Sequence, residues 1–518
     1  MPVLLVVGVL VAGVVALTPV ADRIRVPYPV LLTLFGLAVP LVPGVPDLRI
    51  EPDLILPLVL PPLLFAATQR ATGRDFKDNA GTIGWLAVGL TLASAVAAAA
   101  VAHAMGLPWA PAAALGAIVA PPDPVAATAV ARRLRLPGRL VTVLEGEGMF
   151  NDATALVLYN VAVAAVVAGH VTAGDLGLGL VLALAVGVGL GLLAGVLGHW
   201  ALHGLHSAPA ETTVTIALPF AVYVLADRLE GSGVLAVLTL GLYLRGRSHS
   251  ALTSGGWLLG RAVWRYADYL ITSLVFVFIG FELTEVLSNH DDRGAALAMA
   301  GWVCLTLVAV RFGWVLVVTW LVPRGRGDRP ASGREAVVTS WAGMRGVVTV
   351  ATALALPVAV DGGGAFPDRG TIVVVALVTV LVTLVLQGLT LAPLVTRLRV
   401  GTEVDPAQEV RELRERATLA VLESLDDIGA GAPERVRDAV RLEYQGYLSA
   451  QLALTTARYG GDADDDEGDR EAVEDLLRAA GEVERRVVVD ARSSGAISPE
   501  AADEVLDEVE RRAVRELD

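Results

Sequence analysis

Long apolar runs fill the first 400 positions of the chain, and most charged residues lie between the runs. A helix of about 20 apolar residues spans the ~30 Å hydrocarbon core of a bilayer, and most of the runs approach or exceed this length. The pattern therefore predicts an all-α membrane domain at 1–400 with about thirteen transmembrane helices. The predicted spans are 3–20, 27–42, 53–68, 82–105, 110–131, 137–168, 175–200, 211–228, 231–245, 265–287, 295–322, 335–359 and 370–396.

The apolar pattern stops near Val400, where shorter amphipathic stretches begin. Residues 401–518 carry 31 acidic and 15 basic side chains, whereas residues 1–400 carry 23 and 25. This change predicts a separate acidic tail at 401–518 whose ligand the pattern does not name. Aspartates at alternate positions from Asp462 to Asp469 suggest a calcium loop, but the Gly and Glu that such a loop needs are missing, which favours a solvated linker. Helices are predicted in the tail at about 406–428, 433–459, 470–493 and 499–516.

The connections between the predicted spans differ in their basic residues, with 19 Lys and Arg on the side of the tail and four on the opposite side. Because cytoplasmic connections are the ones enriched in Lys and Arg, we expect a multi-pass protein of the cell membrane, in contact with lipid, whose tail is cytoplasmic. With 54% hydrophobic and 18% charged residues, the chain is too apolar for an ordinary soluble protein. The sequence has no strongly basic segment, so a nucleic-acid partner is not expected. It has a single cysteine, Cys304, which excludes an intrachain disulfide framework.

The run at 137–168 is the candidate site, because carboxylates lie inside it. As a helix it would be ~48 Å long with Asp152 at its midpoint, near the centre of the bilayer. A charged Asp at that depth costs at least ~2.5 kcal/mol, so it is expected to face a cavity or a partner and to have a function. Asn151 precedes it, and Glu145 shares its helical face seven residues earlier.

A second run, at 110–131, contains the segment Pro121-Pro122-Asp123-Pro124 near its centre. Prolines donate no backbone hydrogen bond, so the carbonyls one turn back, including that of Ala120, are left free. Free carbonyls beside a carboxylate are hard oxygen ligands for a cation. Asp123 alternatively caps the half-helix that begins at Pro124, and both roles are compatible.

Two arginines lie inside apolar runs, Arg311 at 295–322 and Arg345 at 335–359. A buried arginine needs an anionic partner, and Glu147 is the candidate for Arg345. We interpret this pair as a structural lock and treat Glu145 and Arg311 as possible accessory residues.

Three motifs, in this order along the chain, resemble bacterial sodium/proton antiporters of the monovalent cation:proton antiporter-1 family. They are Pro121-Pro122-Asp123-Pro124, Gly146-Glu147-Gly148-Met149-Phe150-Asn151-Asp152 and Gly343-Met344-Arg345-Gly346. The resemblance covers residues 1–400. It implies inverted repeats of thirteen helices, discontinuous fifth and twelfth helices, a homodimer and elevator-like alternating access. It also implies that Asp152 binds cation and proton in turn, that Asn151 and Asp123 support it, and that Glu147 pairs with Arg345.

Three positions depart from the family pattern. Pro122 stands where members commonly have Thr, although its backbone carbonyl can still coordinate a cation. Gly148, which offers only backbone, stands where archaeal relatives have a serine ligand, and Ala66 stands where many relatives have Glu. These changes leave the choice among Na+, K+ and Li+ open.

Competition at one carboxylate predicts the activity. Low dielectric favours a protonated or cation-bound Asp152 over a bare carboxylate, so the two ligands exclude each other and exchange follows. We therefore expect an electroneutral cation/proton antiporter rather than an enzyme, with no cofactor and no metal beyond the transported ion. A passive cation channel and an intramembrane aspartyl protease using Asp123 and Asp152 are the alternatives. His199, His203 and His206 recur at helical spacing and suggest a metal site or a pH sensor, with interfacial histidines as the simpler interpretation.

Overall fold

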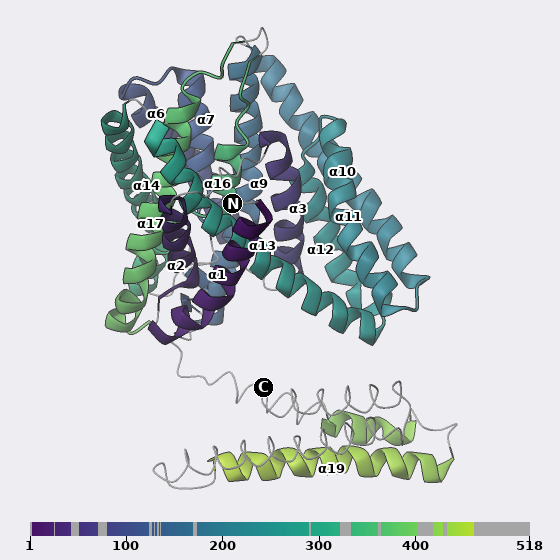
Figure 1. Ribbon diagram of the computed structural model, residues 1–518. Helices are drawn as coiled ribbons and strands as arrows, with labels where there is room; N and C mark the ends of the chain where they lie inside the picture. The colour runs from purple at the N-terminus through teal and green to yellow at the C-terminus, as the bar shows by residue number, and fades with distance from the viewer. Residues whose placement is uncertain are drawn as a thin grey trace. The chain divides into compact units, whose positions relative to one another are not determined.

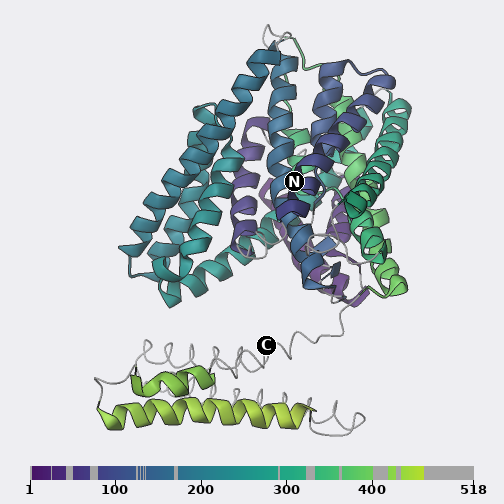
Figure 2. The same ribbon diagram turned by 180° about the vertical axis from the view of Figure 1, so that it is seen from behind.

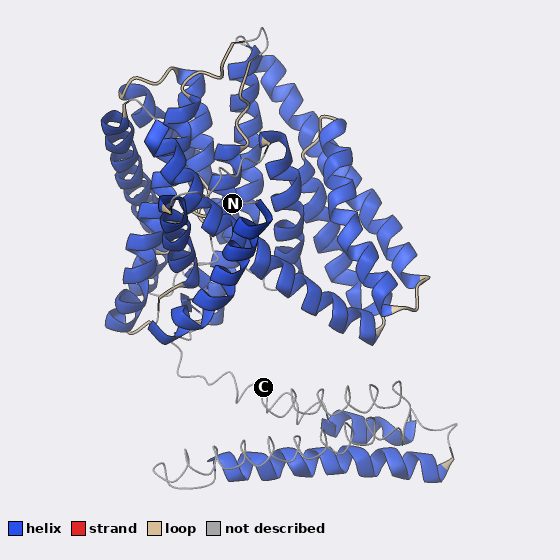
Figure 3. Ribbon diagram, viewed as in Figure 1, coloured by secondary structure: helices blue, strands red, loops and turns tan. Residues whose placement is uncertain are grey.

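The computed structural model describes residues 3–24, 26–42, 51–70, 80–123, 127–128, 130–131, 134, 136–168, 173–289, 292–321, 333–360, 364–400, 418–427 and 433–459. Within these residues the chain is mainly helical, and β-pairing is limited to one isolated bridge between Ala359 and Ala365 (Figure 3). The helices are α1 (Val3–Ile24), α2 (Tyr28–Ala38), η1 (Val39–Leu41), α3 (Pro52–Arg70), α5 (Ala80–Gly84), η2 (Trp85–Leu90), α6 (Thr91–Ala104), α7 (Trp109–Val119), α9 (Gly138–Ala168), α10 (Ala173–His203), α11 (Ala208–Arg228), α12 (Gly233–Ala251), α13 (Ser254–Asn289), α14 (Arg293–Leu321), α15 (Gly333–Trp341), α16 (Val347–Leu354), α17 (Arg369–Leu398) and α19 (Glu434–Tyr459).

These helices confirm the predicted all-α membrane fold. Eight spans among the described residues are long and apolar enough to cross a bilayer, and α1, α2 and α7 contain shorter apolar helices. A helix lies within each predicted apolar run. The count of thirteen spans stays a prediction.

One predicted span begins earlier in the structure than expected, and another is interrupted as the family resemblance implied. The helix expected at 265–287 begins at Ser254, because its first turns are amphipathic: Trp264 is buried while Arg261 and Arg265 on the same helix are exposed. The run at 335–359 contains the predicted discontinuous helix, since α15 ends at Trp341 and α16 begins at Val347.

The membrane-spanning helices form two groups (Figures 1 and 2). In one group α10, α11 and α12 pack on one another and on α3, and in the other α6, α7, α14 and α17 pack together. The long helices α9 and α13 contact helices of both groups. The broken helices therefore lie in the second group, with α9 packed directly against α7 and α16.

The chain divides into two compact units, Met1–Thr402 and Glu403–Asp518. In the second unit, residues 418–427 are helical and α19 confirms the helix predicted at 433–459. Arg441 of α19 bonds to the carboxylates of Asp426 and Asp438, both at 2.7 Å. The predicted helices at 470–493 and 499–516, and the acidic segment at 462–469, lie outside the described residues.

Candidate functional site

The two broken helices bond to each other where they are interrupted. The backbone N–H of Asp123, after α7, donates to the carbonyl of Met344 at 2.6 Å. The N–H of Val347, the first residue of α16, donates to Oδ2 of Asp123 at 3.0 Å. A Cβ atom at Gly346 would lie 1.7 Å from this same oxygen, so the crossing requires glycine there. Asp123 thus caps α16, whereas the expected cap of a half-helix at Pro124 falls partly on 124–126, outside the described residues.

Arg345 caps the C-terminal end of α7, as Asp123 caps the N-terminal end of α16. Its guanidinium donates to the carbonyl of Ala120, just past the last residue of α7, and its own backbone N–H donates to Oγ1 of Thr383 at 3.1 Å. Negative Asp123 therefore lies at the N-terminus of α16 and positive Arg345 at the C-terminus of α7, which are the ends where helix dipoles stabilise these charges. The Ala120 carbonyl is therefore not left free as expected, because it accepts a hydrogen bond from Arg345.

The ion pair of Glu147 is also different from the prediction. Both its carboxylate oxygens accept from Arg311 of α14, through Nη1 to Oε1 and through Nη2 to Oε2, the latter at 2.9 Å. Arg311 Nε donates to the Thr339 carbonyl at 3.1 Å, which fixes the planar guanidinium in a bidentate pose. Glu147 and Arg345 do interact electrostatically, but the bonded partner is Arg311, previously only an accessory candidate. The predicted ion pair of Glu147 with Arg345 is therefore wrong, because Glu147 pairs with Arg311 instead.

Asn151 and Asp152 face the interruption of α7. Asn151 is fully buried, and its Nδ2 donates to the carbonyl of Pro122 at 2.9 Å. Because a carbonyl can only accept, this bond fixes the amide orientation and leaves Oδ1 buried without a hydrogen-bond partner among the described residues. Asp152 is half-buried, interacts electrostatically with Asp123, and makes neither a hydrogen bond nor an ion pair with the described residues.

The other predicted site residues lie further from this contact. Gly148 is buried on α9 between Glu147 and Asn151, and Glu145 is half-buried about one turn before Gly148. Ala66 of α3 lines a separate cavity.

One contributor to the site, Thr383, was not predicted. Thr379, Thr383 and Gln387 are buried on α17 at intervals of four residues, and Thr383 receives the backbone N–H of Arg345. Polar residues recurring every fourth position in an apolar run form one helical face, and this was the available signal.

The described residues do not support the metal-site interpretation of the histidines. No group of three His, Cys, Asp or Glu side chains in this part of the chain converges as metal ligands would. The rings of His199 and His203 stack with their centroids 6.4 Å apart, and His206 is exposed. A pH-sensing role for them stays a prediction.

Comparisons with known proteins agree with the fold and show the family. The model of the transmembrane sodium/hydrogen exchanger family matches residues 8–397. The chain is 35% identical over 450 residues to an uncharacterised Na+/H+ exchanger of Mycobacterium tuberculosis, covering 84% of this chain and 82% of the relative. It is 28% identical over 420 residues to a sodium, potassium, lithium and rubidium/H+ antiporter of Bacillus subtilis, covering 76% of this chain and 62% of that protein.

The fold has a solved counterpart as well. The sodium proton antiporter MjNhaP1 of Methanocaldococcus jannaschii superposes with a TM-score of 0.61 at 20% identity, covering 77% of this chain and 99% of that structure. These relatives are transporters and not enzymes, which excludes the protease interpretation. The chain is a multi-pass membrane protein and belongs to the sodium/hydrogen exchanger family.

Proposed function

We propose that this protein exchanges a monovalent cation for protons and that Asp152 carries each of them in turn. The observation that supports this assignment is the contrast between Asp152 and the other charges at the crossing. Asp123 accepts a backbone N–H, Glu147 is paired with Arg311, and Arg345 is bonded to a carbonyl. Asp152 alone in this group makes no such bond with the described residues, so it is the carboxylate available to a transported ion.

The cation would bind to oxygen atoms. The Asp152 carboxylate supplies the charge, and the buried Oδ1 of Asn151 supplies a neutral ligand that is not engaged by the described residues. The Pro122 carbonyl has a second lone pair beyond the one that accepts from Asn151. With Gly148 lacking a side-chain oxygen, water would complete the coordination. The Bacillus subtilis relative is a sodium, potassium, lithium and rubidium/H+ antiporter, so Na+, K+, Li+ and Rb+ are the set to test.

Exchange follows from the electrostatics of the loaded and empty site. A protonated or cation-bound Asp152 carries no net charge, whereas the bare carboxylate costs at least ~2.5 kcal/mol at the bilayer centre. The site therefore crosses the barrier only when loaded, and the protein exchanges ions without leaking them. Asp123 is engaged as the α16 cap, so one carboxylate titrates in each cycle and the exchange is one-for-one and electroneutral.

The remaining assignments follow from the family and the charge pattern. The protein works as a homodimer in the cell membrane with the tail in the cytoplasm. Residues 1–400 perform the exchange by elevator-like alternating access, and the chemistry does not require the tail at 401–518.

The test is cation-driven proton flux in proteoliposomes that contain a pH-sensitive dye. Asp152→Asn keeps the size of the side chain and removes its titratable charge, so flux should fall to background for every cation. Asp227→Asn, at an exposed position near the end of α11, is the matched control and should exchange like the unmodified protein. Substantial exchange by Asp152→Asn would remove Asp152 from the mechanism. Cation flux without coupled proton movement in the unmodified protein would favour a channel instead.

A further inference from the structure

A cavity of about 620 Å³ lies between α3, α11, α12 and α13, apart from the residues that bond at the helix crossing. Its volume is within the ~300 to 1,000 Å³ range of small-molecule sites. None of Asp123, Asn151 and Asp152 lines it, so cation exchange at Asp152 leaves it without a role.

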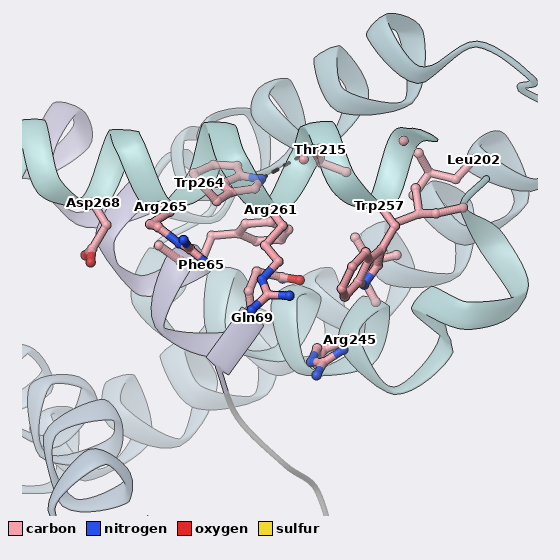
Figure 4. A pocket seen from close by; sticks show the side chains of 15 residues that line it. Phe65, Gln69, Leu202, Thr215, Arg245, Trp257, Arg261, Trp264, Arg265 and Asp268 are labelled. Atoms are coloured by element: carbon pink, nitrogen blue, oxygen red, sulfur yellow. Dashed lines mark hydrogen bonds between the residues drawn. The ribbon is translucent and has the colours of Figure 1, made fainter. Parts of the chain in front are cut away.

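One wall of the cavity is aromatic. The rings of Phe65 and Trp264 lie with their centroids 4.7 Å apart, and Trp264 Nε1 donates to Oγ1 of Thr215 at 3.4 Å (Figure 4). Leu202 and Leu244, both buried, extend this apolar surface. An apolar group of a ligand would find a preformed and rigid surface here.

The edge of the cavity is polar and mostly basic. Arg261 and Arg265 are one turn apart on α13, Arg245 comes from α12, and Gln69 comes from α3 (Figure 4). Asp268 is the single acidic side chain among the lining residues. Neither Arg261 nor Arg265 forms an ion pair with a described residue, although Arg261 lies over the ring of Trp257, 5.2 Å from its centroid. The cavity therefore combines excess positive charge with donors that are not committed to a carboxylate.

The cavity lies toward one face of the membrane unit. The junction of α12 and α13 is on the same face as the C-terminal end of α17 (Figures 1 and 2). The Lys and Arg distribution predicts this face to be cytoplasmic. A bias of basic residues toward the cytoplasmic face is enough to orient a membrane protein. That bias does not explain why three arginines line the same cavity.

We propose that this cavity binds a phosphate-bearing anion, with the phosphate on Arg261 and Arg265 and the rest of the ligand against Trp264 and Phe65. The planar guanidinium presents paired donors that match phosphate oxygens, which is why arginine is favoured at phosphate sites. Two sources share this chemistry, the headgroup of an anionic phospholipid in the adjoining leaflet and a soluble phosphate compound.

Native mass spectrometry of the full-length protein in detergent, with phosphatidylglycerol added, tests the lipid source. Thermal unfolding of the same protein with added inorganic phosphate tests the soluble source. The site variant is Arg261→Gln with Arg265→Gln, both exposed positions that the fold does not bury. The matched control is Arg247→Gln with Arg397→Gln, which removes two exposed positive charges from the same face but from residues that do not line the cavity. Cation-driven exchange by each variant in phosphatidylcholine vesicles reports that it is folded.

We expect one phosphatidylglycerol, or inorganic phosphate, to bind at least about tenfold more weakly to the site variant, while the control variant binds like the unmodified protein. Binding of the lipid alone identifies a headgroup site, and stabilisation by phosphate alone identifies a soluble ligand. Equal weakening in both variants would mean general surface attraction and would overturn the proposal. So would phosphatidylcholine binding as tightly as phosphatidylglycerol with no effect of phosphate, or a site variant that binds both probes unchanged.

Discussion

Substituting Arg311 by Ala should destabilise the membrane unit more than any other single change at the helix crossing. Arg311 holds both carboxylate oxygens of Glu147 and also the Thr339 carbonyl. Glu147 is only 2% exposed, so water cannot replace the lost guanidinium. Removing one partner of such a buried pair costs ~3 to 5 kcal/mol, because the remaining charge stays in low dielectric.

Arg345→Ala is the informative comparison, since Arg345 is equally buried and has the same charge. Its side chain bonds to the backbone carbonyl of Ala120, so the substitution leaves the pair of Glu147 and Arg311 intact. The expected loss is that of one charge-assisted hydrogen bond to a neutral group, ~1.5 to 3 kcal/mol. Arg311→Ala should therefore unfold at a lower temperature than Arg345→Ala.

Thermal unfolding of the purified variants, followed by tryptophan fluorescence in one detergent, measures this order. A double variant, Glu147→Leu with Arg311→Met, removes both charges and should recover most of the stability lost in Arg311→Ala, because apolar replacements of buried pairs are often neutral. Two results would refute the assignment of the pair. One is an Arg345→Ala protein as unstable as Arg311→Ala, and the other is a double variant with no recovery.

Three further predictions concern the crossing and the tail. Gly346→Ala places a Cβ 1.7 Å from Asp123 Oδ2, so it should lower the free energy of unfolding by ~1 to 3 kcal/mol and remove most of the exchange activity. Gly301→Ala is the control, because nothing lies within 4 Å of its Cβ, and it should be neutral in the same unfolding and flux assays. Asn151→Asp adds a second carboxyl beside the Pro122 carbonyl and next to Asp152. If this carboxyl gains a proton with Asp152 and releases it when a cation binds, the charge moved per cycle changes, and exchange should respond to an imposed membrane potential. Truncation after Val400 should leave cation-driven exchange intact, and its complete loss in a truncated protein that still inserts and dimerises would contradict the division of labour between the two units.

The sequence was sufficient to place the candidate site on three helices. Carboxylates inside an apolar run made Asp152 the candidate, and the backbone chemistry of proline predicted the interruption near Asp123, because both arguments depend only on local sequence. The interruption at Arg345 was expected only through the family resemblance, since glycines beside an arginine do not by themselves end a helix.

Pairings across helices could not be derived in the same way. Either buried arginine, Arg311 or Arg345, could have been the partner of Glu147. Only the tertiary structure places Arg311 of α14 against both Glu147 of α9 and the Thr339 carbonyl of α15. The capping of α16 by Asp123 was missed for the same reason, because a cap is normally sought in the residues that precede a helix. Both errors concern which residues are neighbours in the folded protein. The charge and hydrogen-bonding capacity assigned to each residue were not affected.

The reciprocal bonds at the crossing bear on how the site could alternate between the two sides of the membrane. Bending at either interruption would separate Asp123 from the Val347 N–H and Arg345 from the Ala120 carbonyl. Each of these charge-assisted bonds contributes ~1.5 to 3 kcal/mol, and in low dielectric the separated charges would find no replacement partner. A movement that carries α7, α9 and α16 together keeps both bonds and confines the change to the contacts between the two helix groups. The bonding pattern therefore favours the proposed elevator-like displacement of an intact site over local opening of the broken helices.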